Sequence, residues 1–339
     1  MAAAAQNTPR KFVDIFLDEE CWRDIFKGYD IVDVAVLDHR SLHFCLKQAI
    51  PLEEASMLSD ADIPTRLVVL YTDRPAGKNC GSIKIDGMTS PRVGVSRPPF
   101  PRPSGLVAAR GWGGDVYPRG GGIEGPLEQI APRKPCITER LKCINGFTYA
   151  AVRGRGLYKR VDLGRWVPFD AGLPKSGESP KMGFQDIDAF SDDDMYAVGG
   201  EGDVWHFDGT SWKRMHFQDK ARLATVTCAG DGNVYISGEG GSLWVGAKSR
   251  WKPVCKGNSN VSWNDVLWFQ DKLWLASDDD FCHFTSGGIE RVTHDGGIVP
   301  MCGHMDAHNG ILVIADLHRV MSFDGSEWRT LVAPYGTGW

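Results

Sequence analysis

The chain has 339 residues, of which 42% are hydrophobic and 24% are charged, and its formal net charge is −5. This is the composition of an ordinary globular protein, and its 40 glycines indicate many turns. No apolar run approaches the roughly 18 residues that a membrane-spanning helix needs, so we expect no membrane partner.

The N-terminal 29 residues differ from the rest of the chain. They lack the basic-then-apolar order of a signal peptide, and the nine cysteines of the chain form no C-x-x-C pair. We therefore expect a cytoplasmic protein with reduced thiols. Residues 1–10 should form a tail, 12–16 a strand-like segment and 18–26 a short helix that plugs or covers part of the domain that follows.

From residue 30 onward the chain is a repeat. Its anchor residues stand 39 positions apart at Tyr196, Tyr235, Trp274 and Val313. Tyr149 fits the same pattern 47 positions earlier, and residues 105–109 fit it more loosely. Residues 33–45 match residues 186–198 at an offset of 153. Four short strands per period of about 40 residues, separated by turns rich in Gly, Asp and Ser, are typical of a β-propeller blade.

The sequence therefore predicts an all-β fold, a β-propeller most simply read as seven four-stranded blades, with a short N-terminal helical segment. We predict a tail and helix over 1–29 and one propeller domain over 30–339. The predicted blades are 30–87, 88–131, 132–170, 171–219, 220–257, 258–295 and 296–339. A Trp opens the predicted fourth strand at Trp166, Trp212, Trp251 and Trp328, and the last three should be buried between blades.

Two turns carry a resemblance to known proteins. Phe207-Asp208-Gly209 and Phe323-Asp324-Gly325 are each followed closely by a Trp, and they resemble bacterial β-propellers of the Asp-box and Trp-Asp-repeat kind. The resemblance covers most of residues 30–332, although an Asp box carries a further residue between its Asp and its Gly. Propellers with irregular, charged faces also look like the immunity proteins that neutralise bacterial toxins, which is an analogy of fold.

The loops between second and third strands should form one face together with the connections between blades. The need for positive φ explains the glycines in these loops but not their charges. We expect a partner-binding surface on this face, made of Trp112, Asp115, Arg153, Arg155, Glu201, Asp203, Glu239, Asp278, Asp279, Asp280, Asp316 and His318.

Charge is distributed unevenly along the chain. Residues 88–166 hold 14 Lys plus Arg against 5 Asp plus Glu, a net charge of +9, and the remaining residues hold 24 against 38, a net charge of −14. A face with two poles would steer and orient a partner. Solvated surface charge without a role explains the same pattern equally well.

Three functions stay open at this point. The first is a non-enzymatic module that binds and occludes a protein partner, in its sharpest form a cytoplasmic immunity protein that neutralises a toxin domain. The second is a propeller hydrolase or lactonase that uses channel acids such as Asp186 and Asp188, with or without a divalent metal. The third is a scaffold subunit of a larger complex.

Several kinds of chemistry are not expected. The chain has no G-x-S-x-G and no phosphate-binding loop, so we predict no catalytic residues and no cofactor. His304 and His308 would lie about 13 Å apart on a strand at 3.3 Å per residue, so we predict no metal site. Aromatic residues are sparse among the basic ones, which makes nucleic acid an unexpected partner.

Overall fold

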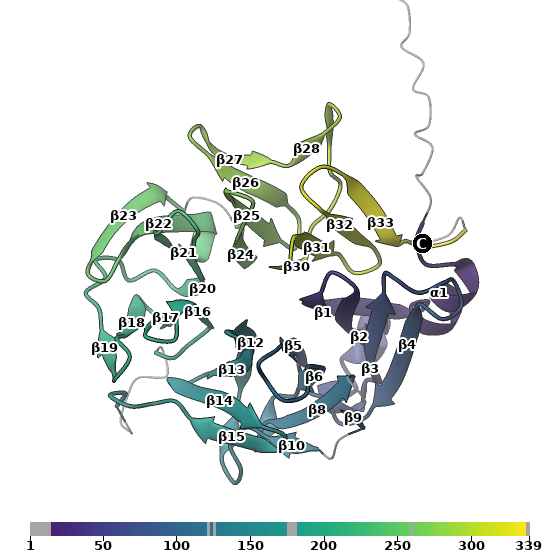
Figure 1. Ribbon diagram of the computed structural model, residues 1–339, viewed down its shortest axis with the longest axis horizontal. Coiled ribbons are helices and arrows are strands. Elements are labelled where there is room, and N and C mark those ends of the chain that lie inside the picture. Colours follow the sequence, from purple (N-terminus) through teal and green to yellow (C-terminus); the bar gives the residue numbers. More distant parts are fainter. Residues whose placement is uncertain (1–14, 121–122, 125–126, 175–181, 258–259, 337–339) are drawn as a thin grey trace, which may run out of the picture.

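The computed structural model describes residues 15–120, 123–124, 127–174, 182–257 and 260–336. The tail predicted over 1–10 and most of the segment predicted over 12–16 lie outside these ranges. Within them, seven antiparallel sheets are arranged around a central axis (Figure 1). The chain is a seven-bladed β-propeller, as its repeat predicts.

The four main strands of each blade follow one another in chain order from the axis outward. Blade 1 consists of β1 (Tyr29–Asp38), β2 (Ser41–Gln48), β3 (Thr65–Tyr71) and β4 (Cys80–Ile85). Blade 2 consists of β5 (Arg92–Ser96), β6 (Ser104–Ala108), β8 (Asp115–Gly120) and β10 (Glu128–Gln129), with β9 (Ile123–Glu124) beside β8. Blade 3 consists of β12 (Thr138–Ile144), β13 (Phe147–Val152), β14 (Gly156–Asp162) and β15 (Arg165–Pro168). Blades 4 and 5 consist of β16 (Asp186–Ser191), β17 (Asp194–Gly199), β18 (Asp203–Phe207) and β19 (Trp212–Arg214); and β20 (Leu223–Cys228), β21 (Val234–Gly238), β22 (Ser242–Ala247) and β23 (Arg250–Cys255). Blades 6 and 7 consist of β24 (Trp263–Phe269), β25 (Lys272–Ser277), β26 (Phe281–Thr285) and β27 (Gly288–Arg291); and β30 (His304–His308), β31 (Ile311–Ala315), β32 (Val320–Phe323) and β33 (Trp328–Val332).

A few elements lie outside the blades. They are the helix α1 (Glu19–Ile25), the short helical turns α2 (Leu52–Ala55), η1 (Asp60–Asp62) and η2 (Glu239–Gly241), and two small ribbons, β7 (Gly111–Trp112) with β11 (Pro135–Cys136) and β28 (Thr293–His294) with β29 (Gly297–Ile298). None of the helices in the described ranges has the length and apolar character that crossing a membrane requires.

The hydrophobic core is divided among the junctions between blades. Because successive side chains of a strand point to opposite faces, each blade offers one apolar face to each neighbour. The buried apolar residues accordingly form seven clusters, one at every junction around the ring. The innermost strand of each blade also contacts the innermost strands of both neighbours. A blade therefore buries its second face only when its neighbour is present.

In the described residues, the ring closes between blades 7 and 1 with all four strands of blade 7 supplied by the C-terminal part of the chain. The backbone N–H groups of Phe16 and Leu17 donate to the carbonyls of Thr330 and Leu331 on β33, each at 3.0 Å. Helix α1 then packs Trp22 and Phe26 into the cluster that joins the two blades. The helix lies at the outer edge of this junction (Figure 1), so it covers part of the ring and does not plug the channel.

The tryptophans that open the fourth strands serve this packing. Trp212 is 2% exposed and Trp251 is 8% exposed, which confirms the predicted burial of both. Trp328 is only half-buried and stacks on Phe323 with ring centroids 4.8 Å apart. The burial predicted for Trp328 is therefore only partly correct, because the outer strand of blade 7 leaves one side of this ring open.

At the junction of blades 1 and 2 the anchor position holds His43 in place of Tyr or Trp. Its ring lies so close to Gly105 that a Cβ there would stand 2.2 Å from its Nδ1 atom. Neither ring nitrogen has a hydrogen-bond partner within the described part of the chain, and the residue is 2% exposed. Burial lowers the pKa of His43 to about 4, and Asp38 opposes this shift only in part.

This histidine should make the protein acid-sensitive. A pKa that is depressed in the folded state means that the unfolded chain takes up a proton first as the pH falls below about 6.5. The free energy of unfolding should therefore fall by about 3 kcal/mol between pH 6.5 and pH 4 on account of His43. Urea unfolding of His43→Phe should show a flatter pH dependence over this interval. The variant His39→Gln, at an exposed position, should keep the wild-type dependence of unfolding free energy on pH. Equal pH dependence for the two variants would contradict the role assigned to His43.

Candidate functional site

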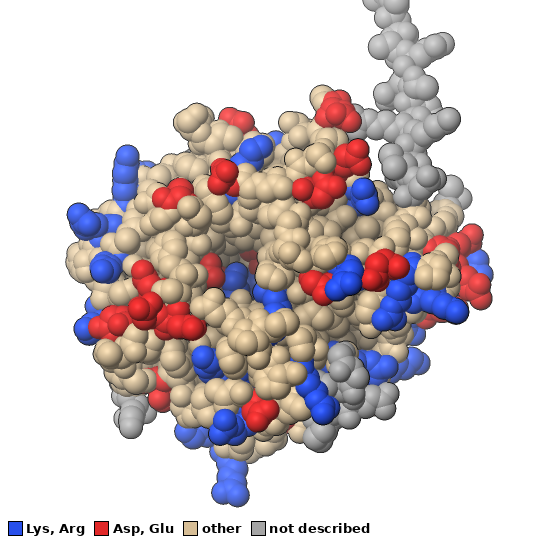
Figure 2. Space-filling view, viewed as in Figure 1, with Lys and Arg blue, Asp and Glu red and all other residues tan. Residues whose placement is uncertain are grey.

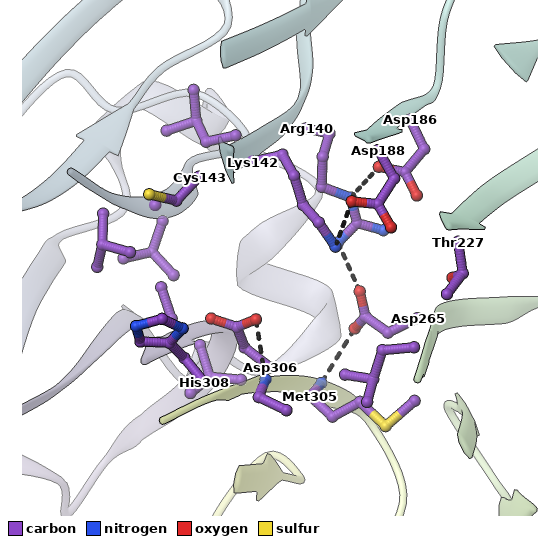
Figure 3. A pocket seen from close by; sticks show the side chains of 18 of the residues that line it. Arg140, Lys142, Cys143, Asp186, Asp188, Thr227, Asp265, Met305, Asp306 and His308 are labelled. Atoms are coloured by element: carbon purple, nitrogen blue, oxygen red, sulfur yellow. Dashed lines mark hydrogen bonds and ion pairs between the residues drawn. The ribbon is translucent and has the colours of Figure 1, made fainter. Parts of the chain in front are cut away.

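The central channel brings acidic and basic side chains together at the axis of the ring (Figure 3). Arg140 and Lys142 enter it from β12 of blade 3. Aspartates enter it from four other blades, at Asp33, Asp186, Asp188, Asp265 and Asp306. Figure 2 shows the hollow at the centre of the ring, with side chains of both signs inside it. The cavity has a volume of about 250 Å³.

Each of these carboxylates accepts a backbone N–H from the inner strand of the next blade. The donors and nitrogen-to-oxygen distances are Val93 to Asp33 at 2.9 Å, Val226 to Asp186 at 3.0 Å, Cys228 to Asp188 at 2.9 Å, Met305 to Asp265 at 3.0 Å and Val36 to Asp306 at 2.8 Å. Hydrogen bonds from backbone N–H groups to a charged carboxylate are among the stronger ones in proteins. The channel aspartates therefore join blades 1 to 2, 4 to 5, 6 to 7 and 7 to 1.

Other side chains of the inner strands join the remaining blades. These contacts are Arg92 Nε to the Glu139 carbonyl at 3.1 Å, Arg140 Nε to Asp186 at 3.3 Å, Lys142 Nζ to Asp188 at 4.0 Å and Thr227 Oγ1 to the Val266 carbonyl. Every junction of the ring thus has at least one polar contact between inner strands. The polar residues of the channel stabilise the closed ring.

Arg140 spans the channel from blade 3 to blade 6. Its Nη1 donates to Asp265 at 2.5 Å, and its Nη2 donates to the Asn264 carbonyl at 2.8 Å. Burial opposes charge at these groups, but Arg140 and His304 hold the pKa of Asp265 well below its usual range. In return, Asp265 outweighs the effect of burial and raises the pKa of His304, whose Nδ1 lies 3.0 Å from Asp265.

This geometry gives little support to the hydrolase or lactonase alternative. A general acid or base needs an oxygen that can face the substrate. The Asp186 side chain is 4% exposed, and its two oxygens accept from the backbone N–H groups of Ile187 and Val226. Asp188 is held between Cys228 N–H and Lys142. We interpret both aspartates as residues that join the blades.

In the described ranges, no three His, Cys, Asp or Glu side chains are placed to hold a metal ion together. All nine cysteines are described, and all are unpaired. Burial raises the pKa of Cys80 to about 12 and that of Cys282 to about 11, so both thiols stay protonated near neutral pH.

The face made by the loops between second and third strands, here called the loop face, carries the predicted binding residues. Two of them need correction. Arg155 is 5% exposed and Asp203 is fully buried, and the two form a bidentate ion pair at 2.6 and 2.9 Å. The Trp205 indole also donates to Asp203 at 2.8 Å. Neither side chain is available to a partner, because the loop folds them inward to join blades 3 and 4.

Four more predicted residues are engaged in local contacts. Asp316, which is 8% exposed, accepts from the backbone of His318 and pairs with Arg319, and Asp280 pairs with Arg291. Asp115 accepts from the Gln129 amide at 2.9 Å. His318 itself is half-buried, with its Nδ1 at 3.7 Å from Asp30. The contacts of these four residues stabilise the loops, so their side chains are less available to a partner.

Three of the six remaining predicted residues are exposed at two separate places on this face. Trp112 is 68% exposed, on the ribbon that β7 forms with β11. Beside this ribbon stand the exposed Arg133 and Lys134, which we call the basic pole. Asp278 and Asp279 are exposed on the loop of blade 6, and we call them the acidic pole.

Between these poles the loop face has a polar cavity of about 400 Å³. Arg153, Glu201 and Glu239 line it together with Lys220 and Arg222. Arg153 pairs with Glu139 at 2.6 Å and keeps 46% of its side chain exposed. The structure thus places these three predicted residues in one cavity of mixed charge.

Much of the basic charge of residues 88–166 is paired inside the molecule. The pairs are Arg97 with Asp306, Arg110 and Arg153 with Glu139, Arg140 with Asp186 and Asp265, Lys142 with Asp188, Arg155 with Asp203 and Arg160 with Glu128. Several of the acidic partners lie on blades 4, 6 and 7. The uneven charge along the sequence therefore reflects ion pairs between blades as well as charged residues at the surface.

Sequence reasoning missed an apolar cleft on the same face. It lies between blades 6, 7 and 1, has a volume of about 700 Å³ and is lined by Leu317, Cys302, Ala315 and Pro334. Leu317 is 55% exposed, and its carbonyl accepts from Ile31 N–H at 2.8 Å. The only signal in the sequence was an apolar residue inside a turn, between Asp316 and His318.

No protein-family model matches the chain. A search of curated proteins finds similarity to Immune protein Tsi7 of Pseudomonas aeruginosa, 29% identical over 190 residues. The match covers 56% of this chain and 62% of that protein, so it spans less than two thirds of the relative's length.

Solved structures share the architecture. The WD40 β-propeller domain of Doa1 superposes with a TM-score of 0.56 at 12% identity, covering 86% of this chain and 92% of that one. YCF48 bound to D1 peptide gives a TM-score of 0.56 at 15% identity, covering 86% and 91%. Virginiamycin B lyase from Staphylococcus aureus gives 0.51 at 8% identity, covering 69% and 82%. At these identities the likeness concerns the fold alone.

Proposed function

We propose that this chain is a non-enzymatic immunity protein of the cytoplasm, whose loop face binds a toxin and covers its active site. The observation that carries the proposal is the similarity, over 190 residues, to a protein named as an immune protein. Occlusion needs a stable scaffold with an adaptable surface, and loops held by a rigid propeller provide both.

The composition of the loop face supports a protein partner. An exposed Trp is uncommon on a surface, and Trp and Arg are the residues that most often dominate binding energy when an interface buries them. Trp112 stands beside the basic pole, and the acidic pole lies across the ring on blade 6. Separated charges of opposite sign orient a partner before contact and speed its association at low salt.

The channel argues for binding without chemistry. Its aspartates are occupied by backbone N–H groups of neighbouring blades, and Arg140 spans its width. The polar groups of the channel therefore stabilise the ring, and we assign the binding of a partner to the loop face.

The partner to test first is the product of a toxin gene found beside the gene for this chain. Co-expression of the chain should restore growth of cells that produce the toxin, and the purified proteins should form a complex. Failure to bind the toxin and to restore growth would overturn the proposal. An enzyme that detoxifies would instead protect cells at amounts far below those of the toxin.

Reversal of the acidic pole tests how the loop face takes part. Asp278→Lys with Asp279→Lys should slow association by about tenfold at low salt and flatten its salt dependence, because steering acts through long-range charge. Asp280 is left unchanged because it pairs with Arg291. Stopped-flow measurements at several salt concentrations give the rates. The control is Asp73→Lys, an exposed residue in the β3–β4 loop at the opposite end of the blades. Equal rates for wild type and both variants would place the binding surface elsewhere.

A further inference from the structure

The ribbon of β7 and β11 presents Trp112 as a knob on the loop face. Pro135 and Cys136 pair with Trp112 and Gly111, and Cys136 is fully buried beneath the ribbon. A Cβ at Gly114 would stand 2.5 Å from the Cys136 sulfur, so the turn lies tightly against this anchor. The indole is therefore exposed on a supported backbone, and the exposed Arg133 and Lys134 directly precede Pro135, its partner in the ribbon.

The apolar cleft between blades 6, 7 and 1 has the opposite character. Leu317, Cys302, Ala315 and Pro334 form its apolar lining, and the cleft volume of about 700 Å³ leaves room for an indole. Asp278 lines the cleft as well, and Asp279 follows it in the exposed loop. Arg319, which also lines the cleft, is paired with Asp316 at 2.6 Å. A Trp fits the apolar lining of this cleft in shape, and a flanking Lys or Arg can meet the carboxylate of Asp278.

The knob and the cleft belong to the same face, the knob at blade 2 and the cleft at blades 6, 7 and 1. Figure 1 shows the places of these blades around the ring. A two-fold axis in the plane of that face places the loop faces of two copies against each other. Every contact from the first copy to the second is then repeated from the second to the first. If this axis crosses the line from knob to cleft at its midpoint and at a right angle, each knob lies over the cleft of the other copy. The same rotation lays each basic pole on the acidic pole opposite.

We propose that the loop face also binds a second copy of this chain, with Trp112 of each copy in the Leu317 cleft of the other. Each buried indole removes roughly 150–250 Å² of apolar surface from water. The four facing Lys and Arg side chains meet four aspartates, so charge favours this orientation over a parallel one. The proposal needs no toxin and therefore does not rest on the proposed function.

Such a dimer would conceal the surface assigned above to a toxin. A partner that needs the same face would have to displace the second copy, because the two complexes exclude each other. The free protein would then protect its exposed indole and apolar cleft from other contacts until a tighter partner is present.

Sedimentation velocity of the full chain, from about 1 to 200 µM, tests the proposal. We expect a reversible dimer whose dissociation constant rises with salt, because facing charges are screened. Trp112→Ala should weaken the dimer by about 30-fold or more, as truncation of a central aromatic does. Leu317→Asp should do the same from the other side. Phe190→Ala removes an aromatic that is 39% exposed at the end of β16, at the opposite end of the blades, and should change nothing.

A charge exchange distinguishes this dimer from any other. Arg133→Glu with Lys134→Glu should weaken it, and Asp278→Lys with Asp279→Lys should weaken it as well. All four changes in one chain restore opposite signs at both contacts and should recover most of the affinity. A monomer throughout the concentration range would overturn the proposal. So would a dimer that persists in Trp112→Ala and in both single-pole variants, because it would use another surface.

Discussion

Replacing Glu128 by Ala is expected to lower the free energy of unfolding by about 3–5 kcal/mol, since it leaves a buried charge unpaired. Arg160 is fully buried, and it donates to Glu128 at 2.9 and 2.5 Å. The Trp166 indole and Gly164 N–H also donate to this carboxylate, at 2.9 and 3.0 Å. Removing the carboxylate leaves the guanidinium without its ion-pair partner and leaves two further N–H donors without their acceptor. Urea denaturation of the full chain measures the loss.

A double variant separates the charge from the packing. Arg160→Met with Glu128→Leu removes both charges and keeps apolar volume, and such replacements are often neutral or mildly stabilising. It should therefore be more stable than Glu128→Ala alone. A loss below about 1 kcal/mol for Glu128→Ala would show that the guanidinium finds water or another partner, contrary to its burial.

Trp212→Ala is expected to cost about 3–5 kcal/mol, the usual range for removal of a large buried aromatic. The indole lies between blades 3 and 4, with ring centroids 5.4 Å from Phe207 and 5.9 Å from Phe169. Its Nε1 donates to the Phe169 carbonyl at 2.9 Å. The substitution therefore opens a cavity and frees a carbonyl at the same junction. Thermal and urea unfolding should both report the loss.

Trp112→Ala is the matched control for this variant. At a chain concentration low enough to keep the protein monomeric, the same substitution at a 68% exposed Trp should change stability by less than about 0.5 kcal/mol, because surface positions leave no cavity. A loss at Trp212 as small as that at Trp112 would mean that the junctions between blades contribute little to stability.

The propeller was predictable because its signals are local and repeated. Anchors such as Tyr196, Tyr235 and Trp274 recur at a fixed spacing, and each lies buried in a second strand. Turn residues mark the ends of the strands, and a strand alternates its faces by geometry. A pattern that repeats along the chain can be read without knowledge of distant contacts.

The site was less predictable because its contacts join distant parts of the chain. Arg155 and Asp203 are 48 positions apart, and Arg140 and Asp265 are 125 positions apart. A charged turn residue looks the same in sequence whether it faces solvent or an opposite charge on the next blade. Exposure of Trp112 followed from its place in a polar loop, whereas the cleft at Leu317 needed three blades to be placed together.

The seam between blades 7 and 1 has a consequence for synthesis on the ribosome. Phe16 and Leu17 bond to β33, so the two sides of this seam leave the ribosome more than 300 residues apart. Until blade 7 has been synthesised, the face of blade 1 that will pack against it has no neighbouring blade. Helix α1 follows directly on this segment, and Phe26 meets Phe44 of blade 1 edge to face at 6.4 Å. The helix can therefore shelter part of this face in the nascent chain, where exposed apolar surface favours aggregation.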